Sequence, residues 1–171
     1  MRLFIAVELP ASVRAAIAQS AGRLREAFPR GRFSRGENYH LTLAFLGETP
    51  EARLSDVTAA MDCCRAQPFA LTVGAVGTFP GGVLWRAVDG GDDLTRLQRL
   101  LTAALCGRGF RLEQRGYKPH LTLAREAVRD PRVPLPDLPP LTCTADHMTL
   151  FRSDRIDGKL VYTPLHRTKF A

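Results

Sequence analysis

Three features are scarce in this chain of 171 residues, and each scarcity narrows its class. No apolar run is long enough to span a membrane, and the first ten residues are too short and too charged for a signal peptide. Cysteine is rare and lacks the Cys-x-x-Cys spacing of a zinc site or a disulfide framework. We therefore expect reduced, partly buried thiols in a cytoplasmic protein. The four cysteines are Cys63, Cys64, Cys106 and Cys143.

Lysine is the third scarce feature, since it occurs only as Lys118, Lys159 and Lys169. Arginine therefore supplies nearly all the positive charge of a chain whose formal net charge is +7. Because a guanidinium binds phosphate oxygens in pairs, this composition fits a polyanionic partner. It fits equally a genome-wide bias towards arginine and alanine, which implies no partner.

The remaining composition predicts one domain with its own core. Hydrophobic residues make up 45% of the chain, which is enough to bury a core and excludes a disordered protein. Apolar runs of strand length alternate with helical stripes, and a proline-rich stretch over 131–140 predicts an exposed extended loop. We expect an α+β fold over residues 1–171. The predicted strands cover 3–7, 40–46, 69–79, 83–88, 141–151 and 159–165, with one more from 120, and the predicted helices cover 10–27, 51–65 and 94–105.

A five-residue sequence, His-Leu-Thr-Leu-Ala, occurs at 40–44 and again at 120–124. Successive side chains of a strand point to opposite faces, so His40 shares a face with Thr42, and His120 shares one with Thr122. A helical stripe and an arginine-rich segment precede each copy. This repetition predicts an internal duplication, with two lobes related by a pseudo-twofold axis and two antiparallel sheets flanked by helices. The two His-Thr faces would then meet across a central cleft.

A third match to the shorter pattern, His147-Met148-Thr149-Leu150, shows that four residues alone are weak evidence. It lacks the fifth residue, the basic approach and the preceding helix. We therefore expect His147 to be a partly exposed strand residue. His166, beside Arg167 near the end of the chain, is expected to be solvated.

The duplicated histidines have two alternatives to a catalytic role. Core histidines satisfied by backbone groups would explain one copy, but repetition of both His and Thr in the same context disfavours that interpretation. A metal site is disfavoured because no Asp, Glu or Cys recurs beside them at ligand spacing and threonine is a poor zinc ligand. An imidazole with a pKa of ~6.5 can serve as acid or base at neutral pH. The pair therefore suits acid–base chemistry on a phosphate, with threonine hydroxyls stabilising its charge.

Four segments also carry a family resemblance: residues 1–10, 37–48 (ENYHLTLAFLGE), 118–125 (KPHLTLAR) and 162–165 (YTPL). They resemble the 2H phosphoesterase superfamily, in particular the bacterial and archaeal RNA 2′,3′-cyclic phosphodiesterases, long called 2′-5′ RNA ligases. The similarity runs from the first residues nearly to the last.

The resemblance implies a bilobal α+β enzyme without metal or other cofactor. It implies hydrolysis of a 2′,3′-cyclic phosphate on an RNA end or nucleotide to a 2′-phosphate, with reversible 2′-5′ ligation as a further expectation. His40 would be the proton donor and His120 the proton acceptor, while Thr42 and Thr122 would hold the phosphate oxygens. We also expect a monomer that does not bind membranes.

Arg125 and Phe45 each directly follow one of the five-residue motifs. The resemblance makes Arg125 the phosphate-contacting candidate, yet strict alternation places it opposite His120 and Thr122 unless the strand bends. Phe45 has the alternation of the leucines, so we expect it in the core, although an aromatic side chain near the cleft could stack on a base. An RNA-end or nucleotide-binding module with little turnover remains the alternative function.

Overall fold

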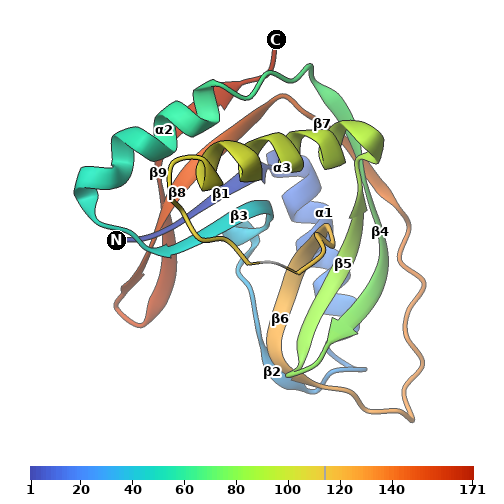
Figure 1. Ribbon diagram of the computed structural model, residues 1–171. Coiled ribbons are helices and arrows are strands. Elements are labelled where there is room, and N and C mark those ends of the chain that lie inside the picture. The colour runs from blue at the N-terminus through green and yellow to red at the C-terminus, as the bar shows by residue number, and fades with distance from the viewer. Residues whose placement is uncertain (114) are drawn as a thin grey trace.

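The computed structural model describes residues 1–113 and 115–171. It contains a four-stranded sheet A, in the order β3-β1-β8-β9, and a five-stranded sheet B, in the order β2-β6-β5-β4-β7 (Figure 1). Neighbouring strands are antiparallel throughout, so the predicted α+β class with two antiparallel sheets is confirmed. In chain order the strands and α-helices are β1 Arg2–Glu8, α1 Ala11–Leu24, β2 Arg30–Phe33, β3 His40–Glu48, α2 Leu54–Asp62, β4 Phe69–Phe79, β5 Val83–Asp89, α3 Gly91–Cys106, β6 His120–Val128, β7 Leu141–Ala145, β8 His147–Ile156 and β9 Lys159–Lys169.

Helices α2 and α3 lie side by side against one face of sheet A (Figure 1). Helix α3 contacts β3 and helix α2 contacts β9. The predicted leucine stripe of α3 forms the contact face, and the four leucines of this stripe are buried. Its members are Leu94, Leu97, Leu101 and Leu105. The other face of sheet A is thereby left for polar side chains of β1 and β3.

A fully buried arginine links helix α1 to sheet B. The Nε atom of Arg86 on β5 donates to the Gly74 carbonyl at 2.8 Å, and its Nη2 atom donates to the Pro139 carbonyl at 2.8 Å. Its Nη1 atom donates to the Ser20 hydroxyl on α1 at 3.4 Å. Because a buried cation needs acceptors on every side, these bonds hold the helix, strand β4 and the end of the proline-rich loop together.

The two histidine strands carry the same irregularity. In β3, the residues paired with β1 jump from Thr42 to Ala44, which leaves Leu43 as an extra residue. In β6, the residues paired with β5 jump from Thr122 to Ala124. Such a bulge shifts the side-chain alternation by one position. The predicted duplication therefore extends to backbone detail that is shared by the two lobes.

One edge strand pairs with the sheet that does not contain its neighbour in the chain. Strand β2 leads along the chain into β3, yet it pairs with β6 in the other sheet. The sequence predicts no strand over 30–33. It shows there only an arginine-rich connection between the first predicted helix and the first histidine strand. Pairing with β6 supplies the hydrogen bonds that a four-residue strand cannot make alone.

The prediction of one strand over 141–151 is wrong. Strand β7 pairs with β4 in sheet B, and the chain then crosses at Asp146 into β8, which pairs with β1 in sheet A. The predicted helix over 51–65 is shorter, because Glu51–Arg53 form a 3₁₀ turn before α2. All four cysteines are free thiols, but the expectation of partial burial holds only for some of them, because Cys63 and Cys106 are exposed.

Candidate active site

The first histidine is held by its own strand. Its Nδ1 atom lies 2.7 Å from the Asn38 carbonyl oxygen, and its Nε2 atom lies 3.1 Å from the Thr42 hydroxyl. A carbonyl only accepts hydrogen bonds, so Nδ1 carries the proton and Nε2 holds the lone pair in the neutral ring. The ring packs against Phe4 and Tyr162, with centroid distances of 4.7 and 5.2 Å. His40 therefore presents a fixed Nε2 atom beside Thr42.

The second histidine repeats this arrangement. The Nδ1 atom of His120 lies 2.6 Å from the Lys118 carbonyl oxygen, two residues before it, just as Asn38 lies two residues before His40. The ring of Phe79 meets His120 edge-on at 5.0 Å, and Trp85 lies 6.3 Å away. Nε2 is again the atom left for chemistry.

The two imidazoles lie close enough to interact electrostatically. Burial lowers the pKa of His40 to about 4, against the hydrogen bond to the Asn38 carbonyl, which raises it. The charges of His120 and Arg125 lower the pKa of His40 further. Strands β3 and β6 also contact each other. The structure thus brings the two predicted histidines together, and His40 is neutral in the free protein at pH 7.

The bulge in β6 leaves Arg125 exposed and within electrostatic range of His40. Beyond the extra residue Leu123, the alternation changes, so both Leu123 and Ala124 are buried and Arg125 is exposed. Its positive charge lowers the pKa of His40 and opposes the burial that raises the pKa of Tyr162. The sequence predicted that Arg125 would face away from His120 unless the strand departs from regular alternation, and β6 has such a departure.

The same bulge overturns the prediction for Phe45. We expected a core residue, but its side chain is 51% exposed. The extra residue Leu43 moves Phe45 to the position in β3 that Arg125 occupies in β6. The guanidinium of Arg2 lies over the Phe45 ring, 5.1 Å from its centroid.

The third histidine has a different environment. His147 is partly exposed, as expected, but its ring lies between two carboxylates: Nδ1 is 2.5 Å from Asp146 and Nε2 is 3.3 Å from Glu8. Thr149 is fully buried and donates to Glu8. Arg167 pairs with the same Glu8 carboxylate at 2.7 Å. Carboxylates lie at both ring nitrogens of His147, whereas a backbone carbonyl holds Nδ1 of His40 and of His120, so this match does not repeat the other two.

The expectation for His166 is only partly right. Its side chain is 30% exposed rather than fully solvated, and Nε2 lies 2.8 Å from an Asp62 oxygen on α2. The residue fastens β9 to that helix.

Sequence reasoning missed the aromatic residues around the histidines. Phe4 and Tyr162 contact His40, whereas Phe79 and Trp85 contact His120. Tyr162 lies in the YTPL segment that carries the resemblance, which was the one available signal.

No group of three or more His, Cys, Asp or Glu side chains in residues 1–113 and 115–171 could hold a metal ion. In the same ranges, no helix is long and apolar enough to cross a membrane.

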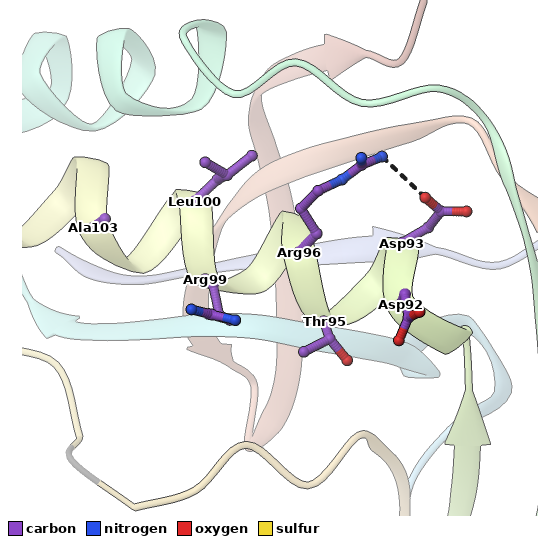
Figure 2. Close-up of a pocket in the computed structure, with 7 residues that line it drawn as sticks. All are labelled: Asp92, Asp93, Thr95, Arg96, Arg99, Leu100 and Ala103. Carbon is purple, nitrogen blue, oxygen red and sulfur yellow. Dashed lines mark hydrogen bonds and ion pairs between the residues drawn. The ribbon is translucent and has the colours of Figure 1, made fainter.

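A surface depression of about 690 Å³ lies elsewhere, along α3 (Figure 2). Its lining includes Asp93 and Arg96, which form an ion pair of 3.0 Å, and the exposed Leu100. None of the four motif residues lines it. The paired histidines therefore remain the candidate active site, since they carry groups suited to proton transfer.

Comparison with known proteins identifies the family of this chain. The model of the 2′-5′ RNA ligase superfamily matches residues 10–157. This chain belongs to that superfamily. It is similar to the RNA 2′,3′-cyclic phosphodiesterase of Thermus thermophilus, with 35% identity over 98% of this chain and 89% of the relative. The crystal structure of E. coli LigT complexed with 3′-AMP superposes with a TM-score of 0.85 and 30% identity, covering 99% of this chain and 97% of that one.

A further superfamily relative is longer. The RNA 2′,3′-cyclic phosphodiesterase of Geobacillus stearothermophilus is 33% identical over 72% of this chain, but the matched part is 41% of that protein. The chain therefore matches less than half of the length of this relative.

Proposed function

We propose that this chain hydrolyses the 2′,3′-cyclic phosphate of an RNA end or nucleotide to a 2′-phosphate. The matched pair of histidines carries the proposal, because each ring is held through Nδ1 by the carbonyl two residues before it and keeps Nε2 for proton transfer. The names of the Thermus and Geobacillus relatives and the 3′-AMP complex of E. coli LigT support it.

In the proposed reaction, Nε2 of His120 takes a proton from water as the water oxygen bonds to phosphorus. The bond from phosphorus to the 3′-oxygen breaks, and protonated Nε2 of His40 gives its proton to that oxygen. The product has a 3′-hydroxyl and a 2′-phosphate. His120 has gained one proton and His40 has lost one, so exchange with solvent restores both.

The acid role requires that substrate binding protonates His40. Burial and the positive charge of Arg125 keep this ring neutral in the free protein. A phosphate anion beside Nε2 would offset both effects, because an opposite charge within a few ångströms favours the charged imidazole. We propose that the bound substrate itself raises the pKa of its proton donor.

The threonine beside His40 would respond to this change. With neutral His40, the Thr42 hydroxyl can donate to Nε2, which lies 3.1 Å away. Once Nε2 is protonated, it can no longer accept, so the hydroxyl proton becomes available for a phosphate oxygen. Thr122 holds the corresponding position in the other motif, and Arg125 would supply the permanent positive charge.

The same arrangement supports ligation. If a 5′-hydroxyl takes the place of water, its oxygen bonds to phosphorus, the 3′-oxygen leaves, and a 2′-5′ linkage forms. Its reverse regenerates the cyclic phosphate. Both histidines come from one chain, so we propose that the monomer is active.

The deciding experiment is an assay on a nucleoside 2′,3′-cyclic phosphate in EDTA, followed by phosphorus NMR. The proposal expects turnover in chelator, because the four motif residues and Arg125 suffice, and it expects a 2′-phosphate product. Complete loss of activity that a divalent ion restores would refute metal independence. Binding without turnover would favour the nucleotide-binding module instead, and a 3′-phosphate product would reverse the substrate orientation.

A further inference from the structure

One row of side chains on β1 leads away from His40. Residues 2, 4, 6 and 8 share a face of this strand, and Phe4 in that row contacts both His40 and Tyr162. Arg2 is the next residue of the row beyond Phe4. It is exposed, and its guanidinium lies over Phe45. Arg2 therefore stands on the same face as the proposed proton donor, one step further out.

The charge of Arg2 lacks a carboxylate partner. Among the described residues, no Asp or Glu oxygen lies within 4.0 Å of either Arg2 or Arg125. Glu48 pairs with Arg2 along the strand, but its carboxylate lies 3.5 Å from the Met1 amino group. Arg152 on the neighbouring strand β8, in contrast, pairs with Asp154 at 2.7 Å.

Both unpaired arginines act on one tyrosine. The charges of Arg125 and Arg2 each lower the pKa of Tyr162, against the burial that raises it, and this ring lies beside His40. Two positive charges thus lie within electrostatic range of Tyr162, which contacts His40. A cyclic phosphodiester carries a single negative charge, for which Arg125 is sufficient. The second cation has no counterpart in a mononucleoside cyclic phosphate.

We propose that Arg2, stacked on Phe45, binds the phosphodiester that precedes the terminal nucleoside. The preferred substrate is then the end of an RNA chain rather than a free nucleotide. A guanidinium suits this task, because it grips phosphate oxygens in pairs while its plane stacks on an aromatic ring. This inference rests on the proposed function, which places the cyclic phosphate at the histidines.

The test compares two substrates that differ by one phosphate. One is adenosine 2′,3′-cyclic phosphate, and the other is the dinucleotide ApA with a 2′,3′-cyclic end. For Arg2→Gln we expect the ratio of kcat/KM, dinucleotide over mononucleotide, to fall about tenfold, the size of a charge-assisted hydrogen bond. The salt dependence of dinucleotide binding should weaken by roughly 0.7 in its logarithmic slope. Arg152→Gln, which removes a partly exposed arginine of the adjacent strand that is paired with Asp154, should leave both unchanged.

A chemical control removes the phosphate charge instead of the arginine. On ApA with a methylphosphonate linkage, wild type should lose the dinucleotide advantage, and Arg2→Gln should lose nothing further. If Arg2→Gln, folded by circular dichroism, lowers kcat/KM equally on both substrates or on neither, the proposed contact is wrong.

A binding measurement separates this inference from the proposed function. Calorimetry with adenosine 2′-phosphate and with ApA ending in a 2′-phosphate needs no turnover. A wild-type protein that hydrolyses neither cyclic substrate would refute the proposed function. The affinity ratio of the two 2′-phosphates, in wild type and Arg2→Gln, would still decide the role of Arg2.

Discussion

The phenol of Tyr117 donates a hydrogen bond of 3.0 Å to the backbone carbonyl of Thr42. Tyr117 stands three residues before His120, whereas Thr42 belongs to the other histidine motif. Strand β3 is an edge strand of sheet A, so no strand among the described residues pairs with its outward carbonyls. This bond therefore joins the two motifs directly and helps to set the distance between the imidazoles.

Removal of that hydroxyl should lower catalysis more than stability. Tyr117→Phe keeps the ring but loses one hydrogen bond, which costs about 1 kcal/mol. Because a small misplacement of acid against base is costly, we expect kcat to fall tenfold or more, with little change in KM. Tyr39→Phe is the matched control, since the Tyr39 hydroxyl donates to the Ser34 carbonyl at 3.3 Å within one connecting segment. Equal activities for the two folded variants would reduce the Tyr117 bond to a structural one.

The three histidines that share the H-x-T pattern should differ sharply in their importance for hydrolysis. His40→Ala and His120→Ala should each abolish nearly all hydrolysis, and the double variant should be little worse, because residues that act as a unit are not additive. His147→Ala should retain wild-type kcat/KM, since its ring lies between Glu8 and Asp146. Steady-state kinetics on folded variants gives the answer. An inactive His147→Ala beside an active His120→Ala would contradict the pairing of the strands.

The duplication could be predicted because the same five-residue motif occurs twice in the sequence. Alternation placed His40 with Thr42 and His120 with Thr122, and the repeated context indicated two similar lobes. The leucine stripe of α3 and the strand hairpin after β4 were equally local signals. Features that depend on a few neighbouring residues were therefore accessible.

The missed features depend on partners that are distant in the sequence. The bulges at Leu43 and Leu123 arise from pairing with β1 and β5, so alternation alone misplaced Phe45 and left Arg125 undecided. The crossing at Asp146 is invisible in a continuous run of strand-forming residues, because only the pairing shows that β7 and β8 belong to different sheets.

Arg125 offers a test of the bulge. Arg125→Ala should lower kcat/KM roughly 10²-fold, as expected when a charge-stabilising donor is lost, and Arg125→Lys should recover only part because lysine cannot bind bidentately. Arg32→Ala is the control: Arg32 faces Arg125 in the strand register, is exposed and pairs with Glu126 at 2.7 Å. It should change kcat/KM by less than about twofold, as is usual for a surface ion pair. Equal losses in Arg32→Ala and Arg125→Ala would indicate a general charge effect rather than a phosphate contact.

The low pKa of His40 predicts a specific pH dependence of folding. The imidazole has a pKa of about 4 in the folded protein and 6.5 as its ordinary value. Between these values the unfolded chain binds a proton that the folded protein refuses, so His40 stabilises the fold above pH 6.5 and this contribution is lost as the pH falls towards 4. His40→Gln cannot titrate. From pH 7.5 to 4.5, wild type should therefore lose on the order of 2 kcal/mol more unfolding free energy than the variant. Urea denaturation at both pH values measures this difference.

Binding of adenosine 2′-phosphate should raise the pKa of His40, whereas adenosine should not, and proton NMR of the imidazole measures the change. Parallel losses in wild type and His40→Gln, with a His40 pKa near 6.5 in the free protein, would contradict the buried neutral imidazole on which the proposed proton donor depends.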